Sequence, residues 1–210
     1  MKTVLHDTPE GIGEHLATRI VAEIRAANAA GRPYVLGCPG GRSPMPVYQA
    51  LEHQLAAAPV DCSRLVIAMM DEYLLEGDDG LHLPSASAHY SCRGFGEREI
   101  VGRINRGLPD ALRVPKANFR MPSLADPAAY DGELAALGGI DLFLLASGAG
   151  DGHIAFNPPG SARESRTRIV TLAEQTRRDN LATFPEFRGI EDVPTDGLTI
   201  GIGSIAALSK

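Results

Sequence analysis

Apolar residues near the start of the chain recur at the spacing of one face of an α-helix. They are Ile12, Leu16, Ile20, Val21 and Ile24. Thr8 precedes them as a capping hydroxyl, and Pro9 suits the first helical position because the N–H that proline lacks has no helical partner there. Since residues 31–33 read Gly-Arg-Pro, we expect the helix to end before them.

Three continuous apolar runs predict strands buried on both faces, as in a parallel sheet: residues 34–37, 65–70 and 140–146. The first run leads into a glycine turn, after which Ser43 is expected to cap, and Pro44 to open, a second helix. The third run breaks into a turn over residues 147–150. Polar residues follow each run, at the strand ends where open α/β sheets bind their ligands.

The other segments continue the alternation of strands and helices. In chain order they predict a surface loop over 77–87, a helix over 88–104, a strand over 117–121, a helix over 126–137, a strand over 167–172, a helix over 173–182 and a strand over 198–203. This pattern predicts a single α/β domain over residues 1–210. We expect a doubly wound, Rossmann-like and mostly parallel sheet with helices on both faces.

Composition narrows the class of protein. A formal net charge of −6 disfavours nucleic acid as a partner, because phosphate backbones require a basic face. No apolar run approaches the ~20 residues of a membrane span, and the first residues lack the apolar core of a signal peptide, so we expect a cytoplasmic protein without a membrane partner. Cys38, Cys62 and Cys92 form no paired motif, and nothing in the sequence predicts a metal or another cofactor.

A candidate anion site follows the first strand, at Gly40, Gly41, Arg42 and Ser43. Backbone N–H groups at a helix start bind phosphate, glycines admit the ligand closely, and Arg42 and Ser43 add a guanidinium and a hydroxyl. A tight connection without a ligand is the alternative. One or two later arginines could also reach a phosphate, from a group expected to be mostly solvated or ion-paired: Arg163, Arg166, Arg168, Arg177 and Arg178.

Acidic residues and a histidine follow the second and third strands. Either Asp71 or Glu72 is a candidate general base, whereas solvated loop acids or helix caps are the alternative. Asp151 and His153 lie among glycines, where an imidazole suits proton transfer near neutrality and a carboxylate can hold its tautomer. The prolines at 158–159 prevent the helix of a dinucleotide fold, which argues against a nicotinamide cofactor.

Four segments together resemble the glucosamine-6-phosphate deaminase (isomerase) family, which is related to the 6-phosphogluconolactonases. They are residues 36–44, 70–73, 152–157 and 165–168, and the likeness runs from the first helix to the end of the chain. The resemblance implies a small-molecule sugar phosphate as partner and a metal-free reaction. In it, the sugar ring opens, a proton moves between C2 and C1, and ammonia leaves to give fructose 6-phosphate. A homo-oligomer is an open alternative.

The resemblance also implies roles for single residues. Asp71 matches the base that transfers the proton, His153 the acid/base that opens the ring, and Asp151 the carboxylate that orients this histidine. The positions that match phosphate contacts are Gly41, Ser43 and Arg177.

The chain departs from the family pattern at three places. Pro158 stands where the deaminases carry a glutamate paired with the histidine, and Arg42 stands where they carry a small residue. The family continues past the position of Lys210 into a strand and a phosphate-binding lysine, so we expect this chain to lack that segment. The favoured hypothesis is an amino-sugar-phosphate isomerase/deaminase. The alternatives are a sugar-phosphate lactonase, in which His153 activates water, and a catalytically impaired sugar-phosphate-binding protein.

Overall fold

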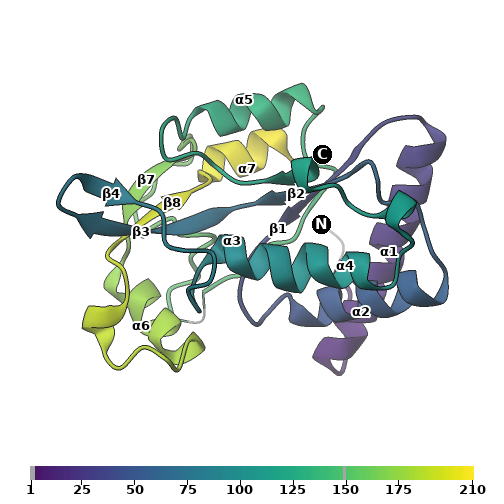
Figure 1. Cartoon of the computed structure of the whole chain (residues 1–210). Coiled ribbons are helices and arrows are strands. Elements are labelled where there is room, and N and C mark those ends of the chain that lie inside the picture. Colours follow the sequence, from purple (N-terminus) through teal and green to yellow (C-terminus); the bar gives the residue numbers. More distant parts are fainter. Residues whose placement is uncertain (1–2, 149) are drawn as a thin grey trace.

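The computed structural model describes residues 3–148 and 150–210, in which strands and helices alternate along most of the chain (Figure 1). The helices are α1 (Pro9–Ala29), α2 (Met45–Ala57), α3 (Cys92–Phe95), α4 (Gly102–Arg106), α5 (Ala129–Ala136), α6 (Glu174–Thr183) and α7 (Ile202–Leu208), and a π-helical segment, Gly96–Val101, joins α3 to α4. The strands are β1 (Tyr34–Cys38), β2 (Leu65–Met69), β3 (Asp71–Gly77), β4 (Gly80–His82), β5 (Phe119–Arg120), β6 (Leu142–Phe143), β7 (Arg168–Thr171) and β8 (Asp196–Thr199). No helix in the described ranges is long and apolar enough to cross a membrane.

The strands form two sheets of four. One is parallel, with the order β5-β2-β1-β6, and the other is antiparallel, with the order β4-β3-β8-β7. β3 follows β2 after Met70, so one extended stretch passes from the first sheet into the second (Figure 1). The α/β class is confirmed. The second sheet adds to the predicted parallel one because the chain stays extended past Met70 and pairs with β8 and β4, where polar residues predicted a loop over 77–87.

Helices cover both faces of the parallel sheet, as the sequence predicts. α1, α2 and α4 pack on one face, over Leu36 and Ile67. α5 and α7 pack on the other face, over Val35 and Val66. Neighbouring strand residues therefore point into opposite layers, as the pleat of a β-strand requires. With both faces buried, the functional residues gather at the carboxyl ends of β1, β2 and β6 and in the loops that follow.

The first two helices begin differently. Thr8 caps α1 as predicted, since its Oγ1 accepts a hydrogen bond from Gly11 N at 3.1 Å. Ser43 does not cap α2: that helix begins at Met45, and no side chain caps it. The reason is a shortage of donors, because Met45 N already donates to Arg42 O and Pro46 has no N–H.

Two predicted strands are shorter than expected. The run over 140–146 pairs with β1 only around Leu142 and Phe143, and the chain then leaves the sheet, so that Leu145 is 47% exposed. The predicted strand over 198–203 is wrong beyond Thr199, because α7 starts at Ile202. Ser165 caps this helix, accepting a hydrogen bond from Ile202 N at 3.0 Å through its Oγ.

Candidate active site

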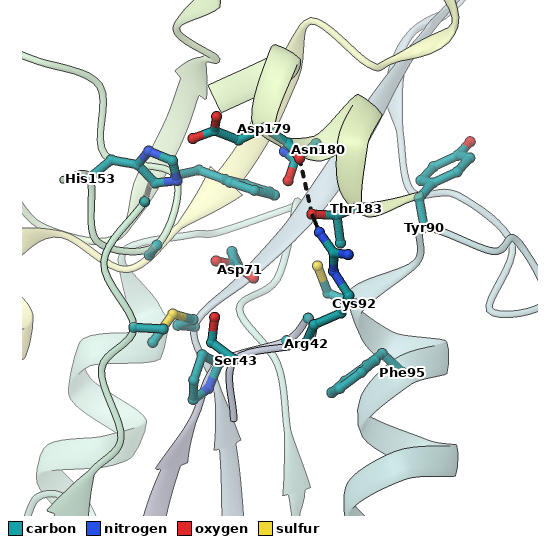
Figure 2. A pocket seen from close by; sticks show the side chains of 18 of the residues that line it. Arg42, Ser43, Asp71, Tyr90, Cys92, Phe95, His153, Asp179, Asn180 and Thr183 are labelled. Carbon is teal, nitrogen blue, oxygen red and sulfur yellow. Dashed lines mark hydrogen bonds between the residues drawn. The ribbon is translucent and has the colours of Figure 1, made fainter. Parts of the chain in front are cut away.

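A cleft of about 330 Å³ lies at the edge where the carboxyl ends of β1, β2 and β6 meet α6 (Figure 2). The cleft is lined by six of the functional residues predicted from the sequence: Gly40, Gly41, Arg42, Ser43, Asp71 and His153. Five aromatic residues also line the cleft, namely Tyr73, Tyr90, Phe95, Phe156 and Phe184. The three predicted groups of functional residues therefore meet in one cleft, although Gly40 and His153 are 113 positions apart along the chain.

The glycine turn after β1 presents unpaired backbone donors to the cleft. Within the described residues, no oxygen accepts a hydrogen bond from the N–H groups of residues 40–43. Tyr48 holds the start of the turn, since its hydroxyl donates to Pro39 O at 2.7 Å. Gly41 has a φ of 88°, a left-handed conformation that favours glycine. These donors are placed to bind an anionic group, although they come from the turn rather than from α2 itself.

Arg42 is the guanidinium of this cleft. Its Nη2 donates to Thr183 Oγ1 at 3.4 Å, across the cleft on α6 (Figure 2). Arg177, which was predicted to bind phosphate, lies elsewhere: its Nη2 donates to the carbonyl oxygens of Ile190 and Val193 and thereby holds that loop. The residues that line the cleft, in the part of the chain that the structure describes, do not include Arg177. Lys210 is also engaged elsewhere, in an ion pair with Asp141 at 2.9 Å.

Asp71 is a buried carboxylate at the wall of the cleft. Its side chain points toward the cleft centre in Figure 2, and the residue is 6% exposed. Burial raises the pKa of Asp71 from 3.8 to about 7; a hydrogen bond from the Cys92 thiol opposes this rise, and the charge of Glu72 adds to it. A carboxylate whose pKa is near neutrality is suited to act as a general base.

Glu72, the second candidate base, is engaged in hydrogen bonds away from the cleft. It is 2% exposed and does not face the cleft. Its Oε1 accepts hydrogen bonds from Tyr73 N and Cys92 N, and its Oε2 accepts them from Ser91 Oγ and Arg93 N, all between 2.8 and 3.0 Å. The carboxylate thus satisfies backbone donors at the start of α3. Helix capping is the correct alternative for Glu72.

His153 stands at the end of a tight hairpin that follows β6. Ser147 and Ile154 form an antiparallel bridge, and Gly148 N donates to His153 O at 2.8 Å. The predicted turn over 147–150 includes Ala149, which lies outside the described residues. His153 Nδ1 lies 2.6 Å from Asp151 Oδ1 and 3.3 Å from Thr176 Oγ1. Since a carboxylate only accepts hydrogen bonds, we assign the proton to Nδ1, which leaves Nε2 for a ligand.

Asp151 stands beside His153 rather than on the lining of the cleft. Burial acts to raise the pKa of Asp151, but hydrogen bonds from the side chain and backbone of His153 outweigh it and hold that pKa below its ordinary value. The carboxylate is therefore charged at neutral pH and can fix the orientation of the imidazole.

Gly148 makes room for the imidazole of His153. A Cβ at position 148 would lie 2.2 Å from His153 Cε1 and Nδ1. We expect Gly148→Ala to displace the ring from Asp151 and to lower kcat/KM about tenfold or more, with little change in the melting temperature. The matched control is Gly132→Ala on α5, where a Cβ meets nothing within 4 Å. A Gly148→Ala enzyme as active as the control would show that the ring position is not critical.

Sequence patterns did not reveal the turn at Ala155. This non-glycine residue has a φ of 51° and lines the cleft. A left-handed alanine costs about 1 kcal/mol and persists only where its surroundings enforce it. Here Asn157 does so: its Nδ2 donates to Ile154 O and Ile200 O, and its Oδ1 accepts from Arg168 Nη1. Arg168 is thus a structural residue of this turn.

A polar face of α6 is the second feature that the sequence did not reveal. Asp179, Asn180 and Thr183 line the cleft opposite the glycine turn (Figure 2). Single carboxylate, imidazole and carboxylate atoms of Asp151, His153 and Asp179 lie within 4.8 Å of one another, which is a geometry that could hold a cation. Cys38, by contrast, is a packing residue as expected, since burial raises the pKa of its thiol to about 12.

Sequence comparisons identify relatives of the chain. The family model described as "Glucosamine-6-phosphate isomerases/6-phosphogluconolactonase" matches residues 7–182. A glucosamine-6-phosphate deaminase of Streptomyces avermitilis is 41% identical over 187 residues, which cover 89% of this chain and 67% of that protein. The corresponding deaminase of an Arthrobacter species is also 41% identical, over 98% of this chain and 72% of its own length.

Solved structures share the fold. A monomeric glucosamine-6-phosphate deaminase has a TM-score of 0.80 and 26% identity, over 98% of this chain and 78% of its own. A 6-phosphogluconolactonase from Leishmania guyanensis has a TM-score of 0.66 over 99% of this chain and 78% of its own. Because its identity is 16%, the latter likeness concerns the fold alone.

Proposed function

Because the chain belongs to the glucosamine-6-phosphate isomerase/6-phosphogluconolactonase family, we propose that it converts glucosamine 6-phosphate, or an epimer, to fructose 6-phosphate and ammonia. The observation that carries the proposal is the pairing, in one cleft, of Asp71 with His153. Asp71 has a pKa near neutrality, and His153 is oriented by a charged carboxylate. An isomerisation needs both a base at C2 and an acid/base at the ring oxygen.

His153 acts first in the proposed reaction. Ring opening moves a proton from the C1 hydroxyl to the ring oxygen while the bond between C1 and that oxygen breaks. The free Nε2 of His153 can take the proton from the C1 hydroxyl and deliver a proton to the ring oxygen. Asp151 supports this transfer, because it holds Nδ1 and stabilises the transient charge of the imidazole.

Asp71 acts on the opened sugar. Its carboxylate takes the proton from C2 while solvent protonates the C1 oxygen, which leaves an enolamine with a double bond between C1 and C2. The carboxyl group then returns its proton to C1, which leaves an iminium at C2, and the hydrolysis of this iminium releases a proton to solvent. Water then adds to the imine carbon at C2 and ammonia leaves. The balance is one sugar phosphate and one water consumed for one fructose 6-phosphate and one ammonia released.

The glycine turn is the proposed phosphate site. The backbone donors of Gly40 and Gly41, the Ser43 hydroxyl and the Arg42 guanidinium all line the same end of the cleft. Oriented N–H groups and a guanidinium bind a phosphate dianion well. We do not include Arg177 in this site, because its guanidinium is bonded to carbonyl oxygens.

Release of ammonia from glucosamine 6-phosphate tests the proposal, with galactosamine 6-phosphate and 6-phosphogluconolactone in parallel. Ammonia from either amino sugar supports it. Hydrolysis of the lactone alone would favour the second candidate, a lactonase, for which Arg42 in the phosphate turn and Pro158 are the specific observations. Binding of sugar phosphates without turnover would favour a binding protein.

The acid limb of the pH profile should report Asp71. Because burial holds the pKa of Asp71 at about 7 and the carboxylate form is the base, kcat/KM should fall about tenfold per pH unit well below pH 7. The titration of the substrate's phosphate group is separated from that of Asp71 by measuring substrate binding to Asp71→Asn over the same pH range. A profile that stays flat between pH 5.5 and pH 7 would contradict the assignment.

His153→Gln should impair mainly the use of the closed sugar ring. Glutamine keeps hydrogen bonds but cannot transfer a proton near neutrality, so we expect a loss of about 10²-fold or more in kcat/KM. An analogue that lacks the C4 and C5 hydroxyls cannot close a furanose or a pyranose ring, so His153→Gln should process it nearly as well as the wild type does. An equal loss on both substrates would count against a role of His153 in ring opening.

The same proposal includes a cytoplasmic location, where phosphorylated sugars are metabolised. It includes a small molecule as the partner and neither a nucleic acid nor a membrane. Light scattering on the purified protein decides between a monomer and a homo-oligomer.

A further inference from the structure

His153 receives no acid group from the segment that follows its hairpin. Pro158 stands where the family resemblance implies a glutamate, and its carbonyl accepts hydrogen bonds from Ser161 N at 3.0 Å and Ser161 Oγ at 2.7 Å. The cleft lining, as far as the described residues go, does not include Pro158. If a second carboxylate serves His153, another element of the fold must supply it.

α6 places a carboxylate beside this histidine. Thr176 and Asp179 are three positions apart on α6 and therefore share one face of the helix. Thr176 Oγ1 lies 3.3 Å from His153 Nδ1. One carboxylate oxygen of Asp179 lies within 4.8 Å of both a ring nitrogen of His153 and a carboxylate oxygen of Asp151. Figure 2 shows Asp179 and His153 on the same side of the cleft.

Two hydrogen bonds hold Asp179 in this position. Its Oδ1 accepts from Gln175 Nε2 at 2.9 Å, one turn earlier on α6. Its Oδ2 accepts from Gly150 N at 3.4 Å, in the hairpin that carries His153. The carboxylate therefore connects α6 to the hairpin that carries His153.

We propose that Asp179 is a positioning residue that takes the place of the missing glutamate, by holding the hairpin and stabilising the protonated imidazole of His153 during ring opening. The inference rests on the proposed function and goes beyond it, since it assigns the supporting carboxylate to a helix that the sequence motifs do not include. Arg42 reaches the same helix at a different residue, since its Nη2 donates to Thr183 Oγ1 at 3.4 Å.

The test compares Asp179→Asn with Asp179→Glu and with Glu174→Gln. Glu174 is the matched control, because it lies on the same helix but pairs with Arg178 on the exposed side. We expect Asp179→Asn to lower kcat/KM for glucosamine 6-phosphate by about 10- to 100-fold. With the open analogue that lacks the C4 and C5 hydroxyls, the loss of kcat/KM should be less than about threefold. Asp179→Glu should recover most of the activity, and Glu174→Gln should match the wild type.

The outcomes separate this inference from the proposed function. A wild-type enzyme that releases ammonia while Asp179→Asn matches it would overturn the inference and leave the proposed function standing. An equal loss of kcat/KM on closed and open substrates would overturn it too. Asp179 would then contact the substrate's amino group or stabilise the fold. A wild-type protein inactive on every amino sugar would overturn the proposed function itself, and the inference with it.

Discussion

Asp71→Asn is expected to lower ammonia release by about 10²- to 10⁴-fold while the affinity for a sugar phosphate stays nearly unchanged. Asparagine has the shape of aspartate but cannot accept the C2 proton, and the proposed phosphate site lies on other residues. The measurement pairs steady-state kinetics with calorimetric binding of fructose 6-phosphate. A loss of less than tenfold would remove Asp71 from the mechanism, and a parallel loss of binding would give it a structural role.

The same substitution should stabilise the protein at alkaline pH. The pKa of Asp71 is raised from 3.8 to about 7, so the folded state keeps a proton that the unfolded state loses between these pH values. The free energy of unfolding therefore falls as the pH rises through this window, by at most about 4 kcal/mol. Asparagine carries no charge at any pH. We expect Asp71→Asn to exceed the wild type in urea stability at pH 8 but not at pH 4.

The sequence predicted the parts of the fold that depend on local patterns. The apolar runs at 34–37 and 65–70, the cap at Thr8 and the glycine turn all have their causes within a few neighbouring residues, and the structure contains them. The ends of those strands also predicted which residues would meet in one cleft. Parallel strands bring their carboxyl ends to one edge whatever their distance along the chain.

Features with distant causes could not be predicted in the same way. α7 begins where it does because Ser165 accepts a hydrogen bond from Ile202, 37 positions away. Arg177 matches a family position, but its guanidinium is bonded to the loop at Ile190 and Val193. The strand period shows that neighbouring side chains point to opposite faces, but not which face is the cleft. The hydrogen bonds that decide this for Glu72 come from residues 91–93.

Glu72→Gln should destabilise the protein by about 2–4 kcal/mol, although it lies next to the proposed base. The carboxylate accepts four hydrogen bonds, and a carboxamide would turn its NH2 group toward two of the donors. A buried donor left unpaired costs about 1–3 kcal/mol, and more when the lost acceptor was charged. For a chain of this size the melting temperature should fall by about 5–15 °C. Urea unfolding at pH 7 measures the loss directly.

The control is Glu76→Gln on the same strand, where the side chain is exposed and the stability should stay within about 0.5 kcal/mol of the wild type. The folded fraction of Glu72→Gln should keep the kcat of the wild type within about threefold, because Glu72 touches neither the cleft nor its ligand. A stable but inactive Glu72→Gln would show that Glu72, and not Asp71, is the catalytic carboxylate. The pair of substitutions thus separates chemistry from architecture at adjacent positions: Asp71→Asn should give a stable, inactive protein, and Glu72→Gln an active but unstable one.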